Sequence, residues 1–159
     1  MKTNYLLSNR FKKIGWILFI PSIILGLLFV IFQFQPKFLD IKVFAILGAQ
    51  GPFSGTTFCN IIKTNVTDEI IGTLLIISLC LIAFSKEKEE DEFIARIRLE
   101  SLLWATYINY AILILAILFV YGGLALWVVI FNIYTILLFF IIRFNWIIVK
   151  SRKLARNEK

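Results

Sequence analysis

Polar residues inside the apolar parts of this chain are few, and two asparagines stand out among them. Asn109 and Asn132 lie in separate apolar stretches, and Tyr110 follows the first of them. Amides at such positions most often hydrogen-bond one membrane helix to another, a contact worth about 1 kcal/mol or less. We therefore interpret Asn109, Tyr110 and Asn132 as a candidate polar seam that joins helices, with a ligand pocket as the alternative.

Charged residues gather at the ends of the apolar stretches. Reflection about the Tyr121-Gly122-Gly123 turn places Arg143 near Glu100, so we expect an ion pair there, with an anionic-lipid or substrate site as the alternative. Glu92 and Arg96 have the order and spacing that favour an ion pair on a helix. Candidate contacts for a docking partner or for lipid are Glu92, Arg96, Arg98, Lys150, Arg152 and Lys153.

Several kinds of membrane enzyme and transporter are excluded by residues that the sequence lacks. It contains no histidine, and its cysteines, Cys59 and Cys80, form no CxxC motif. His-dependent metalloprotease or haem chemistry and disulfide exchange between paired thiols therefore lack their residues. No Asp or Glu lies inside an apolar stretch, which argues against proton-coupled transport within this chain alone. We expect no enzymatic activity, no metal and no cofactor.

The candidate site residues named above lie in or beside four uncharged apolar stretches, which determine where they are placed. Of the whole chain, 60% is hydrophobic. The stretches cover residues 14–34, 70–84, 101–121 and 124–142. A helix of about 20 apolar residues crosses the hydrocarbon core of a bilayer. The second stretch is short and needs its flanking residues to cross. The stretches are apolar all round, which disfavours a soluble bundle. The predicted fold class is an all-α, integral membrane four-helix bundle.

The predicted organisation is a single membrane domain, 1–159. Thr67, followed by two acids, is the expected cap of the second helix. Within the outer loop, residues 38–47 are interpreted as a short strand or a helix on the membrane surface. No small-x-small cleavage site follows the first span, so we expect an uncleaved anchor. The segments in order are a first span 14–34, an outer loop 35–67, a second span 68–85, a cytoplasmic helix 87–100 that runs into a third span 101–121, a fourth span 124–149 and a basic tail 150–159.

Basic residues predict the orientation of the chain. Four Lys or Arg precede the first span, four lie between the second and third, and six follow residue 142, so that 14 of 17 fall on one side. Cytoplasmic loops of membrane proteins are enriched in these residues, which predicts N-in/C-in topology. The net charge of +7 is explained by this topology, and we expect no nucleic-acid partner.

Two segments of the chain carry a resemblance to known proteins. They are Phe84–Arg98 with the following Leu99-Glu100-Ser101-Leu102-Leu103-Trp104-Ala105-Thr106-Tyr107-Ile108-Asn109-Tyr110, and Phe131-Asn132 through Ile142-Arg143-Phe144. These segments resemble uncharacterised small four-span inner-membrane proteins of Bacteroidetes-type bacteria. The resemblance covers about half of the chain and supplies no catalytic residue. It implies a bacterial inner (cytoplasmic) membrane location, a gene that lies beside the gene of a small helix-turn-helix regulator, and hence a regulatory association.

The function predicted from the sequence is that of a non-enzymatic membrane accessory or signalling protein. It would act through a cytoplasmic docking surface formed by residues 87–98 and the basic tail. Its expected partners are the lipid bilayer and another membrane or cytoplasmic protein. The alternative is a small-solute or lipid transporter or channel formed by oligomerisation, with the polar seam lining the path. An intramembrane enzyme is a third class, for which the needed residues are missing.

Overall fold

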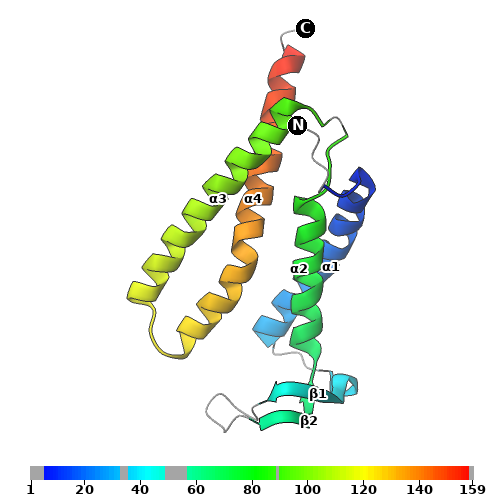
Figure 1. Cartoon of the computed structure of the whole chain (residues 1–159), viewed down its shortest axis with the longest axis vertical. Coiled ribbons are helices and arrows are strands. Elements are labelled where there is room, and N and C mark those ends of the chain that lie inside the picture. Colours follow the sequence, from blue (N-terminus) through cyan, green and yellow to red (C-terminus); the bar gives the residue numbers. More distant parts are fainter. Residues whose placement is uncertain (1–5, 33–35, 49–56, 89, 158–159) are drawn as a thin grey trace. The chain divides into compact units, whose positions relative to one another are not determined.

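The computed structural model describes residues 6–32, 36–48, 57–88 and 90–157. Within these ranges the chain forms four α-helices, a short 3-10 helix and a two-stranded sheet (Figure 1). The fold is mainly helical, as the sequence predicts. Two compact units make up the chain, and each is described by itself. The first contains residues 1–19 and 75–159, and the second contains residues 20–74.

Three of the described helices are long and apolar enough to cross a membrane. They are α1 (Asn9–Phe32), α3 (Glu92–Phe119) and α4 (Gly123–Asn157). α2 (Thr67–Ala83) has 17 residues, which is about 25 Å of helix and slightly less than a bilayer core of about 30 Å. α1 continues through Pro21 without a break. The helices are those that a multi-pass membrane protein requires.

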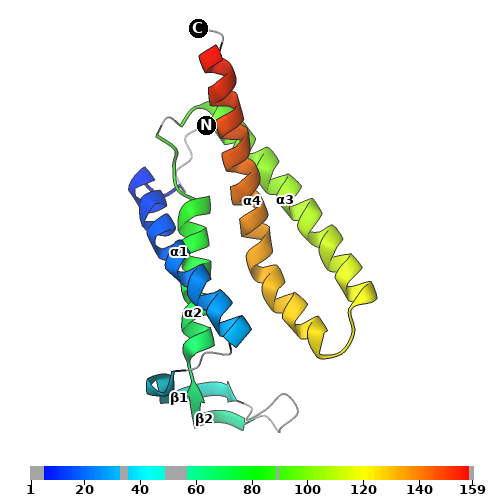
Figure 2. The same ribbon diagram turned by 180° about the vertical axis from the view of Figure 1, so that it is seen from behind.

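α3 and α4 lie side by side as an antiparallel hairpin in the first unit (Figures 1 and 2). α3 ends at Phe119, and the Val120 N–H closes its last turn on the Ala116 carbonyl at 2.8 Å. Gly122 has a φ of 72°, a left-handed conformation that glycine adopts without strain. α4 begins at the next residue. The tight turn predicted at Tyr121-Gly122-Gly123 is therefore confirmed.

The charged segment before α3 is helical over a shorter range than the sequence predicts. α3 begins at Glu92 rather than at residue 87, because the Asp91 carboxylate accepts the Ile94 N–H at 2.8 Å and caps the first turn. From Glu92 the helix runs into the apolar segment without a break, as expected. α4 continues through most of the predicted basic tail to Asn157, so the tail is helical over its described residues.

The apolar core of the first unit lies where α2 ends and α3 begins. Small side chains bring the helices together there: Ser101 and Ala105 of α3 are fully buried. On α1, a Cβ at Gly15 would lie 2.8 Å from Ile82 Cγ1, so this close approach requires glycine. The buried apolar residues are Leu79, Ile82, Ala83, Ile94, Ile97, Ala105, Phe140, Ile141, Phe144 and Ile148.

The second unit carries a β-hairpin, an element that the all-α prediction lacks. β1 (Asp40–Gly48) pairs antiparallel with β2 (Thr57–Asn65), and the 3-10 helix Lys37–Leu39 precedes it. Of the two alternatives for residues 38–47, the structure has the strand. Residues 49–56, which connect the two strands, lie outside the described residues.

Asn65, rather than Thr67, caps α2. Its side-chain carbonyl accepts the Thr67 N–H at 3.1 Å and also the Thr67 hydroxyl. The predicted cap is displaced because Thr67 is itself the first helical residue and Asn65 precedes it by two positions. The amide of Asn65 also donates to the Pro36 carbonyl at 3.1 Å and to Asp40 Oδ1 at 2.7 Å. One side chain thus joins both ends of the hairpin segment to the first turn of α2.

Candidate functional site

The segment before α1 pairs with the link that follows α2. The Leu7 N–H donates to the Phe84 carbonyl at 2.9 Å, and the Lys86 N–H donates to the Leu7 carbonyl at 2.8 Å. Asn9, at the start of α1, donates its side-chain amide to the Lys86 carbonyl at 2.7 Å. These bonds hold the beginning of α1 against the end of α2.

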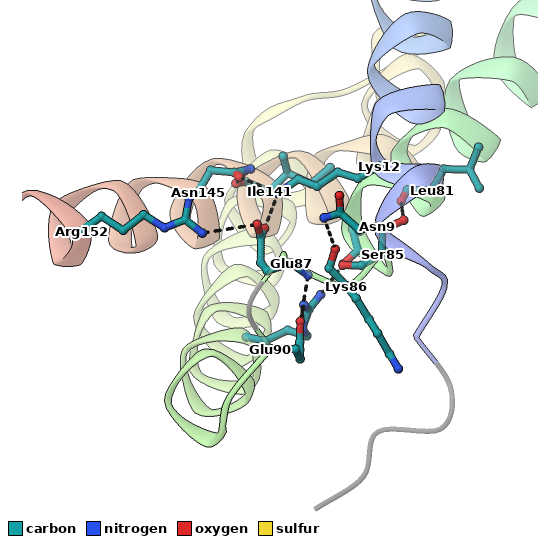
Figure 3. A network of polar contacts seen from close by, with 12 residues as sticks. Asn9, Lys12, Leu81, Ser85, Lys86, Glu87, Glu90, Ile141, Asn145 and Arg152 are labelled. Carbon is teal, nitrogen blue, oxygen red and sulfur yellow. Dashed lines mark hydrogen bonds and ion pairs between the residues drawn. The ribbon is translucent and has the colours of Figure 1, made fainter.

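Glu87 lies at the centre of a group of charged residues from three parts of the first unit (Figure 3). Its side chain is 8% exposed and accepts from Lys12 Nζ of α1. Arg152 of α4 approaches the other carboxylate oxygen at 3.8 Å. Lys12 also donates to Asn145 Oδ1 at 3.3 Å, and Asn145 Nδ2 donates to the Ile141 carbonyl at 2.8 Å.

Arg98 of α3 binds the end of α2 and the link after it. Its Nη1 donates to the Ala83 carbonyl at 3.0 Å and to the Ser85 carbonyl at 3.2 Å. Ala83 is the last residue of α2 and Ser85 lies two residues beyond it, and carbonyls at the C-terminal end of a helix have no partner within the helix. Its Nη2 donates to both carboxylate oxygens of Glu90 at 3.1 Å. The guanidinium also lies 4.7 Å from the ring centroid of Phe144 on α4.

We call this set the polar junction. Charged groups this poorly exposed are tolerated only when they are paired, because their transfer from water costs several kcal/mol each. The pairing is nearly complete within the described residues, although Arg98 Nε has no hydrogen-bond partner there. The junction therefore fixes four chain segments at one place. Its members are Asn9, Lys12, Glu87, Glu90, Arg98, Asn145 and Arg152.

The predicted ion pair between Glu100 and Arg143 does not form. Glu100 instead accepts from Arg96 Nε at 3.0 Å, one turn away on the same helix. The Arg143 guanidinium lies over the Trp104 ring, 4.7 Å from its centroid. Each member of the expected pair thus has a nearer partner: a local i,i+4 ion pair for the acid and an aromatic face for the arginine.

The six predicted docking or lipid contacts fall into two groups. Arg98 has a side chain only 12% exposed, and Arg152 is held by Glu87, so both belong to the polar junction. The prediction of Arg98 as a docking contact is wrong, because its position on α3 turns its side chain inward toward α2 and α4. Arg152, although paired with Glu87, is nevertheless 59% exposed. The four that lie exposed outside the polar junction are Glu92, Arg96, Lys150 and Lys153.

Sequence reasoning missed Asn9, Lys12 and Asn145 as members of the site, and it placed Glu87 and Glu90 only within the docking segment 87–98. The sequence marks Lys12 only as one of several basic residues before the first span. Asn145 offers a usable signal, because it is an amide in the apolar part of the fourth span.

The polar seam forms between α3 and α4, with Thr135 in place of Tyr110. Asn109 Nδ2 donates to Asn132 Oδ1 at 3.3 Å, and the Thr135 hydroxyl donates to Asn109 Oδ1 at 2.5 Å. Asn109 is only 3% exposed. Tyr110 lies outside the seam and is 54% exposed, because consecutive helical residues point about 100° apart. The seam is therefore Asn109, Asn132 and Thr135.

Fold and site together define a membrane-type helical protein whose helix ends are joined by an ion-paired junction. Among the described residues, no group of three or more His, Cys, Asp or Glu is placed to hold a metal ion. Comparison of the chain with protein-family models, with curated proteins and with solved structures found no match.

Proposed function

We propose that the chain is a bacterial inner-membrane protein with four spans and with both termini in the cytoplasm. Support comes from the polar junction, where the start of α1, the link after α2, the start of α3 and the end of α4 meet. When α1 crosses the bilayer away from this junction, α2 has to return the chain to it. Its 17 residues are short, and local thinning of the bilayer accommodates such a helix at modest cost.

We further propose that the protein is a non-enzymatic accessory or signalling protein that docks a partner at its cytoplasmic end. One observation carries this proposal. The polar junction largely buries Arg98 and pairs the exposed Arg152 with Glu87, but it leaves Arg96, Lys150 and Lys153 exposed beside it. These exposed groups stand on helices that the junction holds in place. A pre-organised surface of this kind loses little conformational entropy when it binds.

The α4 part of this docking surface combines apolar and basic groups. A shallow, wide-open groove lies on one face of this single helix and is lined by apolar side chains and two lysines. Trp146 is 70% exposed and stands beside the basic end. Aromatic residues are enriched in protein interfaces, and the lysines favour an acidic partner. The groove is lined by Ile142, Asn145, Trp146, Val149, Lys150 and Lys153.

Reversing the two exposed lysine charges tests the docking proposal. We expect Lys150→Glu with Lys153→Glu to reduce partner recovery in a mild-detergent pull-down about tenfold, as a loss of roughly 1.4 kcal/mol would. Quantitative mass spectrometry of the bound proteins measures the ratio. The matched control is Lys13→Glu with Lys88→Glu, which makes the same charge change at two other exposed lysines. Unchanged recovery, or an equal loss in the control, contradicts the proposal.

A transporter or channel formed by oligomerisation is the second candidate. The observation in its favour is a buried amide, Asn109, that meets polar groups of α4 within two apolar helices. These groups hydrogen-bond one another, which is what a packing contact between helices requires. Under the leading proposal, the seam is such a contact.

Removing both amides distinguishes the two candidates. We expect Asn109→Leu with Asn132→Leu to lower the free energy of unfolding by about 1 kcal/mol and to change no solute flux in reconstituted vesicles. Tyr110→Leu, on the exposed side of the same helix, is the control and should leave stability unchanged. Loss of a flux signal with unfolding unaffected would instead favour the seam as a transport site.

A further inference from the structure

We propose that one face of the β-hairpin rests on the surface of the bilayer and binds anionic phospholipid there. The proposal concerns the second unit alone and does not require the docking function of the first. It does require that the helices cross a membrane. The face in question carries Lys42, Phe44 and Ile46 of β1 and Ile61 and Lys63 of β2, and we call it the lysine face.

Large apolar side chains of the lysine face are exposed. Phe44 lies opposite Ile61 in the strand register, and Ile46 follows on the same side of β1. Their exposed fractions are 68%, 64% and 69%. On the opposite face Val43, Ala45 and Ile62 are half-buried, and Ile41 is less exposed, at 45%, than the apolar residues of the lysine face. A two-stranded sheet is marginally stable by itself in water, so an apolar face of this kind needs a surface to cover it.

Charge on the same face indicates which surface that is. Lys42 and Lys63 are directly opposite each other, and like charges in that position destabilise a strand pair. Both are exposed, and neither forms an ion pair with another described residue. Asp40, the acid on that face, is hydrogen-bonded to Asn65. A phosphate between the two lysines would remove their repulsion.

The connection to α2 keeps the hairpin close to the membrane. Asn65 ends β2, and its side chain caps α2 two residues later. The apolar part of α2 begins at Ile70, only about 8 Å of helix rise beyond Asn65. The lysine face therefore stays within reach of the headgroups at whichever membrane surface α2 begins. Basic residues beside exposed aromatic and aliphatic groups are the usual composition of segments that lie in this interface.

Spin labels on the two faces of the hairpin test the placement. The full chain with Cys59→Ser and Cys80→Ser is reconstituted in phosphatidylcholine vesicles, and a nitroxide is attached at Ile46→Cys. We expect this label to collide more with lipid-soluble oxygen than with a water-soluble nickel chelate. A label at Ala45→Cys, on the opposite face, should show the reverse. Ile61→Cys provides a second, independent position on the lysine face.

Added phosphatidylglycerol tests the charge requirement. Adding phosphatidylglycerol to these vesicles in increasing amounts should raise the oxygen accessibility of the Ile46→Cys label relative to its nickel accessibility. Lys42→Gln with Lys63→Gln should raise the phosphatidylglycerol concentration needed for this shift by about 25-fold, since each basic residue near an anionic surface contributes about fivefold. Lys13→Gln with Lys88→Gln is the matched control and should change little.

Three results would overturn the proposal. Equal access of the nickel chelate to positions 45 and 46 would place the lysine face in water. Protection of position 46 from both oxygen and nickel would show that protein covers it, either a second copy or another part of the chain. An equal effect of the two lysine pairs would show that phosphatidylglycerol acts through general charge and not through a site on the hairpin.

Discussion

Replacing Glu87 by glutamine is expected to lower the free energy of unfolding by roughly 3 kcal/mol. The carboxylate is 8% exposed and neutralises Lys12, whose own side chain is 16% exposed. Its loss leaves an ammonium group poorly solvated and without a counter-charge, which is why one half of a buried pair costs so much to remove. Arg152 is 59% exposed and can turn to water, so it adds little to the effect.

Reversible unfolding in mixed detergent, followed by circular dichroism, measures this change. Glu100→Gln is the matched control, because it removes a carboxylate from an exposed pair with Arg96 and should cost less than about 0.5 kcal/mol. Lys12→Met combined with Glu87→Gln should recover part of the loss, since both charges of the pair are then gone. Equal effects of Glu87→Gln and Glu100→Gln would show that the polar junction carries no special stability.

Replacing Arg98 by leucine is expected to destabilise the first unit by about 3 kcal/mol or more. The guanidinium serves four acceptors on two chain segments, the Ala83 and Ser85 carbonyls and both oxygens of Glu90. Leucine fills part of the volume but removes the donor from all four acceptors, of which Glu90 Oε2 keeps a second donor, the Glu87 N–H at 2.9 Å.

Arg98→Lys should recover only part of the lost stability, because a single ammonium nitrogen cannot replace both Nη1, which binds the two backbone carbonyls, and Nη2, which binds Glu90. Arg96→Leu, two residues earlier on the same helix, is the control and should be nearly neutral, since its side chain is 80% exposed. The same detergent unfolding assay applies. A loss for Arg96→Leu as large as that for Arg98→Leu would contradict the role assigned to Arg98.

Contacts set by local spacing could be predicted from the sequence. The glycines at the α3–α4 turn fix the alignment of the two helices, and this alignment brings Asn109 and Asn132 together as expected. The same alignment also predicted an ion pair between Glu100 and Arg143, and that prediction is wrong. Being level along a hairpin is a weaker constraint than an i,i+4 partner such as Arg96 or a neighbouring aromatic face.

The polar junction could not be predicted, because it joins residues far apart in the chain. Lys12 is 75 residues from Glu87 and 133 from Asn145. The sequence also could not separate Arg96 from Arg98. Two positions along a helix point in different directions, and which direction is inward depends on where α2 and α4 pack. The short apolar segment at residues 38–47 fits a strand or a helix equally by periodicity, so its assignment needed the structure.

Cysteine labelling with a membrane-impermeant maleimide tests most directly the claim that the four segment ends meet on one, cytoplasmic, side. Single cysteines are placed at exposed positions of three of the four segments, as Ser8→Cys, Lys88→Cys and Leu154→Cys, in the Cys59→Ser, Cys80→Ser background. Asn60→Cys, exposed on the face of the hairpin opposite the lysine face, reports on the other side in the same background. We predict that the Asn60→Cys protein is labelled in intact cells and the other three only after the membrane is opened. Labelling of any of the three in intact cells, or protection of the Asn60→Cys protein there, would contradict the arrangement.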